Sequence, residues 1–229
     1  MLRKYPQFSF AFAIVFFAEL IAVTTNLKEL RFITKPLITI SLMLFVYFTI
    51  KRKSRFTNKI ITGLFFSLMG DVFLMFPHVD EIYFMLGLGS FLIAHLFYIA
   101  AFYLDSTNKI EVEKRYVLPI FLVFGFSCMA YYLLLRPHLG SMNIPVLIYS
   151  FTITLMAIMA ALRYGKTNTK SFAWVLVGAI LFMISDSILA YNKFVERVEI
   201  GDLLIMATYM LAQFFIAMGT VERKFVKKN

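Results

Sequence analysis

Long apolar runs separated by short polar gaps make up most of this 229-residue sequence. A helix that crosses a bilayer needs about 20 mostly apolar residues, with a range of roughly 17–25. The runs that qualify cover about 8–25, 35–50, 60–76, 82–104, 116–135, 144–162, 171–191 and 200–221. They are continuously apolar rather than alternating, which excludes a membrane β-barrel. The pattern therefore predicts an all-α integral membrane protein with eight transmembrane helices, in a single membrane domain over 1–229.

The composition favours lipid rather than water as the surroundings of these runs. Hydrophobic residues make up 61% of the chain, against about 45–50% in a soluble domain. The net charge of +10 is also found in nucleic-acid-binding proteins. Here the basic residues cluster in the short gaps between apolar runs, as they do in cytoplasmic loops. We therefore expect no nucleic-acid partner. The single cysteine, Cys128, lies inside an apolar run and excludes an intrachain disulfide.

The distribution of lysine and arginine predicts the orientation. With the N-terminus inside, the inner segments carry 17 of these residues and the outer segments carry 6, which is the bias expected of cytoplasmic loops. Both termini are thus expected to be cytoplasmic, and the membrane to be the cytoplasmic (inner) one. The first apolar run contains Glu19 and lacks a small-x-small cleavage site before Asn26, so we expect it to be retained as the first helix.

The second half of the sequence resembles the first. The second, third and fourth runs match the sixth, seventh and eighth in order. The matched pairs are Pro36 and Pro145, Ser41 and Ser150, Gly63 and Gly178, Asp71 and Asp186, and His95 and Gln213. Chance similarity between apolar helices is the alternative. The matches predict a 4+4 parallel internal duplication, 1–110 and 111–229, with an axis near the membrane normal and a site between the halves.

Three acidic residues lie within the apolar runs. An acid in this environment costs about 2.5–3.5 kcal/mol on insertion scales, so each requires an explanation. Counting from the outer ends of the runs places Asp71 and Asp186 roughly 8 Å deep and Glu19 roughly 9 Å deep. The three depths predict one shared cavity in the outer half of the membrane. A purely structural role is the alternative. The matched pair favours function, whereas for Glu19 the two roles are equally open.

Five other polar residues are candidates for lining this site. Lys35 opens the second run and can hold a phosphate facing the cavity, although simple snorkelling to the interface explains it on residues alone. His95 and Gln213 are expected roughly 20 Å deep, as a cavity floor or an interhelical hydrogen bond, and a structural role for His95 is at least as plausible as catalysis. Tyr98 and Tyr209, each one turn away, can complete that network.

The sequence predicts neither a metal nor an organic cofactor. There is no HExxH or CxxC spacing, and there is no glycine-rich phosphate loop or nucleophile elbow. Any chemistry is therefore expected to come from the intramembrane side chains.

Several of these residues occur in an ordered set of short motifs that resembles the YhhN family of membrane proteins, the lysoplasmalogenases. The motifs are Lys35-Pro36-Leu, Leu68-Met-Gly-Asp71, Ala94-His95-Leu-Phe-Tyr98, Ile184-Ser-Asp186 and Ala212-Gln213. The resemblance spans essentially all eight runs. It implies hydrolysis of the vinyl ether bond of a lysoplasmalogen, a single-chain lysophospholipid, to a fatty aldehyde and a glycerophospho-ethanolamine or -choline. It also makes Asp71 and Asp186 the leading catalytic candidates, and Lys35, His95, Tyr98 and Gln213 candidates for lining the site.

This reaction needs a proton delivered to carbon, which makes an oxocarbenium ion that water then captures. Two buried carboxyls close together are suited to sharing one proton, and the division of labour resembles that of glycosidase carboxylate pairs. We hypothesise that Asp71 and Asp186 form this pair, with either one as the donor, while Lys35 holds the phosphate. A proton-coupled transporter and a non-catalytic, lipid-binding scaffold are the alternatives. The oligomeric state does not follow from the sequence.

Overall fold

The computed structural model describes residues 4–76, 80–106 and 116–225, and this part of the chain is almost entirely α-helical. The α-helices are α1 (Pro6–Thr24), α2 (Lys28–Thr49), α3 (Arg55–Phe73), α4 (Glu81–Ser106), α5 (Val117–Leu135), α6 (Asn143–Ala161), α7 (Thr169–Phe194) and α8 (Gly201–Val221). Two short 3-10 helices, η2 (Arg136–His138) and η3 (Gly140–Met142), connect α5 to α6. Within the described ranges the extended pairing is limited to one isolated bridge, between Thr167 and Phe225.

The molecule is an integral, multi-pass membrane protein. Every helix except α3 is long and apolar enough to cross a bilayer, which gives seven candidate spans in the described part of the chain. The α3 helix carries Lys59 and Asp71 within its 19 residues and falls short on composition, although it packs along α4 inside the bundle. Large apolar side chains such as Phe48 and Phe126 are more than 70% exposed. Apolar surface on this scale requires lipid to cover it.

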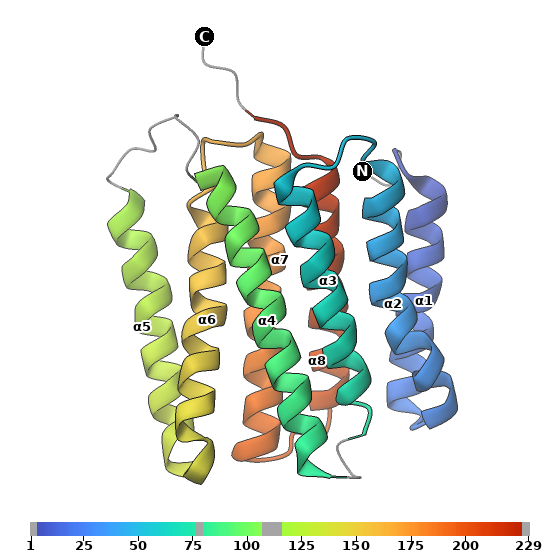
Figure 1. Ribbon diagram of the computed structural model, residues 1–229. Coiled ribbons are helices and arrows are strands. Elements are labelled where there is room, and N and C mark those ends of the chain that lie inside the picture. Colours follow the sequence, from blue (N-terminus) through green and yellow to red (C-terminus); the bar gives the residue numbers. More distant parts are fainter. Residues whose placement is uncertain (1–3, 77–79, 107–115, 226–229) are drawn as a thin grey trace.

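The helices run side by side along one bundle (Figure 1). Figure 1 shows α1 and α2 at one edge, α5 and α6 at the other, and α3, α4, α7 and α8 between them. The chain enters α1 and leaves α8 at the same end, where Lys4 Nζ lies 2.7 Å from Glu222 Oε1. The hydrogen bond to Glu222 raises the pKa of Lys4. Of the basic residues counted for the inner side, Arg3, Lys109, Lys114, Arg115, Lys227 and Lys228 lie outside the described residues.

Two helix pairs pack most closely, α3 with α4 and α7 with α8. A glycine permits each close approach, because a Cβ there would overlap the facing helix. At Gly63 the Cβ would meet the ring of Tyr98, and at Gly178 it would lie 2.9 Å from the carbonyl oxygen of Ala212. Small residues at such crossings are typical of membrane helix packing.

A charged cluster, the Asp105 cluster, ties three helix ends together at the end where Lys4 meets Glu222. Asp105 lies in the last turn of α4, and its carboxylate accepts hydrogen bonds from Arg163, just after α6, and Arg223, just after α8. The distance from Arg163 Nε to Asp105 Oδ2 is 3.0 Å, and both side chains are fully buried. Arg163 also donates to Ser171 at 2.9 Å. The apolar pattern missed Asp105, because the fourth run was expected to end at residue 104.

The helix boundaries differ from the sequence expectation at positions that matter for the site. The α2 helix begins at Lys28 rather than near residue 35, because its first two turns are amphipathic and carry polar residues that the apolar pattern excludes. Lys35 is therefore two turns inside the helix. The α3 helix ends two residues after Asp71, and α7 ends eight residues after Asp186. Counting from the ends of the apolar runs gave Asp71 and Asp186 equal depths, whereas counting from these helix ends does not.

Candidate active site

Asp71 lies at the meeting point of α2, α3 and α8. Its Oδ2 accepts hydrogen bonds from the hydroxyls of Thr39 at 2.9 Å and Tyr209 at 2.6 Å. Lys35 Nζ lies 3.8 Å from its Oδ1. The carboxyl is 1% exposed. Two hydroxyl donors and a nearby ammonium are the environment in which a buried carboxylate is stabilised.

A chain of hydrogen bonds extends from Asp71 toward the centre of the bundle. The Gln213 amide donates to the hydroxyl of Tyr209 at 3.4 Å, and its carbonyl accepts from the hydroxyl of Tyr98 at 2.8 Å. All three side chains are buried. Such a network fixes the position of the Tyr209 hydroxyl, because each member constrains the next.

Asp186 lies between α4, α6 and α7 and has a different environment. The Tyr149 hydroxyl donates to its Oδ2 at 2.5 Å. His95 Nε2 lies 3.8 Å from the same oxygen, which is too long for a direct hydrogen bond. His95 is fully buried, and neither ring nitrogen has a hydrogen-bond partner in the described part of the chain. Its ring packs edge-on against Tyr149 and Phe182.

Both aspartates line one polar cavity of about 330 Å³. The other charged or amide residues that line this polar cavity are Arg31, Lys35, Asn192, Lys193, Arg197 and Asp202. They come from the first turns of α2 and α8, the last turns of α7 and the following loop, at the end of the bundle opposite to Lys4 and Glu222. The cavity thus brings two acids together with an excess of positive charge.

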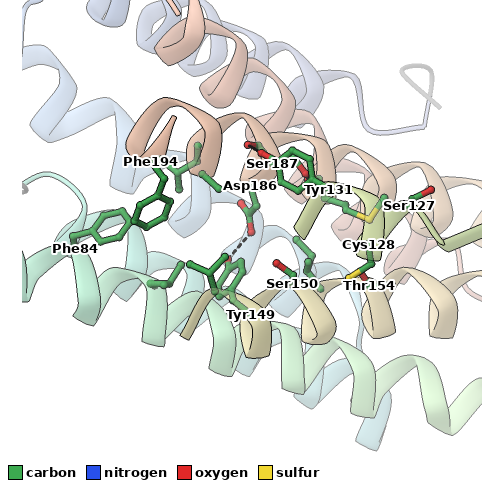
Figure 2. Close-up of a pocket in the computed structure, with 16 residues that line it drawn as sticks. Phe84, Ser127, Cys128, Tyr131, Tyr149, Ser150, Thr154, Asp186, Ser187 and Phe194 are labelled. Carbon is green, nitrogen blue, oxygen red and sulfur yellow. Dashed lines mark hydrogen bonds between the residues drawn. The ribbon is translucent and has the colours of Figure 1, made fainter. Parts of the chain in front are cut away.

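A second space, the apolar chamber, lies on the other side of Asp186. It has a volume of about 270 Å³ and is formed by α4, α5, α6 and α7. Figure 2 shows Asp186 near its middle, with Phe84 and Phe194 toward one end and Ser127, Cys128 and Thr154 toward the other. Asp186, Phe84 and Leu189 line both the apolar chamber and the polar cavity. Asp186 therefore lies at the boundary between a charged space and a hydrocarbon-like one.

Of the other predicted residues, Tyr209 lines the polar cavity, whereas Glu19, His95, Tyr98 and Gln213 do not. Glu19 is fully buried; it accepts a hydrogen bond from Thr34 at 2.5 Å, and its Oε1 lies 3.4 Å from Nε of Arg31. It thus acts on the cavity through Arg31. His95, Tyr98 and Gln213 lie behind the two aspartates, each of them buried. Lys35 does not snorkel to the interface, because its side chain is only 6% exposed and approaches Asp71.

Sequence reasoning named Tyr209, which donates to Asp71, but missed one hydroxyl donor to each acid, Thr39 for Asp71 and Tyr149 for Asp186. Thr39 and Tyr149 each lie between the matched proline and serine of their helices, so the repeat drew attention to the segments but not to these positions. Arg31 and Arg197 were counted only as outer loop charges. No group of three or more histidine, cysteine, aspartate or glutamate side chains that could hold a metal occurs among the described residues.

Fold and site together define a multi-pass α-helical membrane protein with two aspartates in one cavity beside an apolar chamber. The chain belongs to the YhhN family, whose model matches residues 30–220.

Curated relatives extend this assignment. The chain is 34% identical to lysoplasmalogenase TMEM86A of Homo sapiens over 173 residues, 73% of this chain and 67% of that protein. It is 30% identical to lysoplasmalogenase TMEM86B of Sus scrofa over 167 residues, 73% of this chain and 65% of that protein. With the lysoplasmalogenase of Mycobacterium tuberculosis it shares 28% identity over 160 residues, 70% of this chain and 59% of that protein. The matches span about two thirds of these relatives or less. No solved structure matches the chain.

Proposed function

We propose that this protein is a lysoplasmalogenase, which hydrolyses the vinyl ether bond of a single-chain lysophospholipid within the membrane. The observation that carries the proposal is the position of Asp186 at the boundary of the polar cavity and the apolar chamber. The vinyl ether of a lysoplasmalogen lies at the same boundary in the substrate, between a charged head group and a hydrocarbon chain. The lysoplasmalogenase names of three relatives support the reaction.

The polar cavity suits a zwitterionic head group. Arg31, Lys35 and Arg197 can surround a phosphate, and arginine in particular matches phosphate geometry. Asp202, whose Oδ2 lies 3.4 Å from Nη2 of Arg197, offers a partner for the ammonium of an ethanolamine or choline. Glu19 would hold Arg31 in place through their 3.4 Å contact. Lys35 can contact both the phosphate and Asp71, since it lines the cavity and its Nζ lies 3.8 Å from Oδ1 of Asp71.

The chemistry begins with proton transfer to carbon. The second carbon of the alkenyl chain accepts the proton, the double-bond electrons form the new C–H bond, and positive charge develops on the ether carbon and oxygen. Water then adds to that carbon and loses a proton, which restores the acid. The hemiacetal hydroxyl then loses its proton and forms the aldehyde carbonyl as the bond to the glycerol oxygen breaks, and the glycerol oxygen takes up a proton. No cofactor is required by this scheme.

We assign the proton donor as Asp186 and the stabilising carboxylate as Asp71. The carbon that accepts the proton lies on the chain side of the ether, and Asp186 lines the apolar chamber whereas Asp71 does not. Asp71, with its hydroxyl donors and Lys35, is suited to oppose the positive charge on the head-group side. General acid catalysis contributes typically 10²–10⁴-fold, and electrostatic stabilisation of the cation supplies much of the rest.

We also propose that the chain contains the parallel 4+4 internal duplication and that both of its termini are cytoplasmic. Its support is the repeated packing scheme: α2 packs against α3 and α8, while α6 packs against α7 and α4. Each aspartate is then approached by the second helix of its own half and the fourth helix of the other. The strong inner bias of lysine and arginine favours cytoplasmic termini in the cytoplasmic membrane, which leaves the polar cavity in the outer half.

The test is hydrolysis of alkenyl-glycerophosphoethanolamine in D₂O by the purified protein in lipid nanodiscs. We expect aldehyde with one deuterium on the carbon next to the carbonyl, and losses of at least about 100-fold in Asp71→Asn and Asp186→Asn. Nanodisc-embedded variants that remain folded by size-exclusion chromatography are compared. Aldehyde without deuterium on that carbon would exclude protonation at carbon. Full activity in both variants would remove the aspartates from the mechanism.

A further inference from the structure

We propose that the apolar chamber is the binding site for the hydrocarbon chain of the substrate, and that Cys128 on α5 contacts this chain. The assignment of the chain as an alkenyl chain rests on the proposed function. The chamber itself is defined by geometry: it adjoins the polar cavity at Asp186, Phe84 and Leu189, which line both spaces.

The lining of the chamber selects a hydrocarbon. Its walls are mostly aliphatic and aromatic, and polar lining residues such as Ser127 and Ser187 direct their hydroxyls to the backbone of their own helices, at Val123 and Met183. The hydroxyl of Tyr131 likewise donates to the backbone of Ser187. These three hydroxyls are thus occupied, and an occupant meets mostly apolar surface.

The direction of the chain follows from the arrangement of the two adjoining spaces. A head group held by the basic residues of the polar cavity places the first chain atoms beside Asp186. Figure 2 shows Cys128 and Thr154 on the far side of Asp186 from Phe84 and Phe194. Thr154 lies five residues along α6 from Tyr149, or roughly 7 Å deeper. The chain would therefore pass Asp186 and run toward Cys128 and the centre of the membrane.

The α5 helix gives the chain a route from the bilayer. Leu135 is the one buried residue of α5, and the helix packs mainly against α6, with a smaller contact to α7. It lies at the edge of the bundle in Figure 1. A wall with so few buried contacts can move at low energetic cost, so a lipid chain can slide in sideways while its head group stays in the polar cavity.

The single cysteine of the chain makes the chamber directly testable. Cys128 in nanodiscs is alkylated with N-ethylmaleimide, with and without a non-hydrolysable alkyl-ether lysophosphoethanolamine. We expect the lipid to slow labelling several-fold. The matched control is the Cys128→Ser, Met129→Cys variant, whose thiol replaces a lipid-facing side chain that is 56% exposed and lies outside the chamber. Its labelling should not change with the lipid.

A second measurement does not depend on thiol reactivity. Each buried methylene contributes about fourfold in affinity, so filling the chamber with Cys128→Trp should lower the ratio of kcat/KM for a long alkenyl chain to that for a short one by about tenfold. Met129→Trp should leave this ratio unchanged. An unchanged ratio in Cys128→Trp would overturn the chain assignment.

The outcomes separate this proposal from the proposed function. Aldehyde release by the wild type, without protection of Cys128 and with an unchanged chain-length ratio, would support the hydrolase activity but refute binding of the chain in the apolar chamber. Protection of Cys128 without aldehyde release would support the chamber as a binding site for a lipid chain and refute the proposed hydrolase activity. Equal protection of the thiols at positions 128 and 129 would reduce the effect to bulk lipid and overturn the site.

Discussion

Replacing Tyr149 by phenylalanine removes the hydroxyl that donates to Asp186. The substitution deletes a single oxygen and keeps the aromatic ring, which packs edge-on against His95 with ring centroids 5.4 Å apart. Tyr149 is 8% exposed, so the phenyl ring has a site of the right shape to fill. The effect is therefore expected on the acid rather than on the fold.

The magnitude follows from the charge that appears on Asp186 when it gives up its proton. The bond from Tyr149, at 2.5 Å, strengthens as the carboxyl becomes a carboxylate, so it stabilises the transition state more than the ground state. A hydrogen bond to a charged group contributes about 1.5–3 kcal/mol, and about 1.4 kcal/mol is tenfold in rate. Tyr149→Phe should lower kcat by roughly 10- to 100-fold with little change in KM.

The assay is steady-state aldehyde release in nanodiscs over a range of substrate concentrations. The control is Tyr132→Phe, which removes a hydroxyl that is hydrogen-bonded at 3.0 Å to Asn143 on the neighbouring helix. Tyr132 lines neither the polar cavity nor the apolar chamber. Combining Tyr149→Phe with Asp186→Asn should add little to the loss from Asp186→Asn alone, because the two act as a unit. A kcat within twofold of wild type, or a rise in KM alone, would refute the role of Asp186 as donor.

Two further predictions concern stability. Asp105→Asn leaves the fully buried Arg163 without its charge partner and should destabilise the fold by about 3–5 kcal/mol. We expect a lower unfolding temperature, while the activity per folded molecule stays near wild type. An unchanged unfolding temperature would contradict the importance of this ion pair. Gly178→Ala would place a Cβ 2.9 Å from the carbonyl oxygen of Ala212 and should destabilise the fold by about 1–3 kcal/mol. The control, Gly125→Ala, meets no neighbouring atom within 4 Å of the added Cβ and should be neutral or stabilising. Equal effects at both positions would argue against close α7–α8 packing.

The fold class follows from the sequence because a continuous apolar run in lipid has only one way to pair its backbone. Helix ends were harder to predict, since polar residues continue a helix beyond its apolar part. The first two turns of α2, from Lys28 onward, illustrate this: they lie outside the apolar run, yet they carry Arg31 into the polar cavity. The same error placed Lys35 at the start of its helix rather than inside it.

The two acids could be found from the sequence, because an intramembrane carboxyl is costly and a repeated one is unlikely to be accidental. Lys35, His95 and Tyr209 could be named as candidates, but which acid each one contacts could not be predicted, and Thr39 and Tyr149 were not found at all. Tyr149 and His95 are ordinary residues of apolar helices until the bundle brings α6 and α4 against α7. The apolar chamber was equally hidden, because a cavity depends on how side chains from four helices fail to fill the space between them.

The proposed duplication is compatible with the different roles that we propose for the two matched acids. Lys35 precedes Pro36 in the first half, and Ile144 stands at the position before the matched proline in the second. Ile144 is 69% exposed and carries no charge, so the second half lacks the equivalent of the ammonium beside Asp71. Among the described residues no lysine or arginine forms an ion pair with Asp186. One acid thus retains a cation that favours its ionised form, whereas the other faces an apolar chamber that favours its protonated form. A symmetric pair would have to share these tasks, whereas a lysine present in one half only separates them in the proposed mechanism.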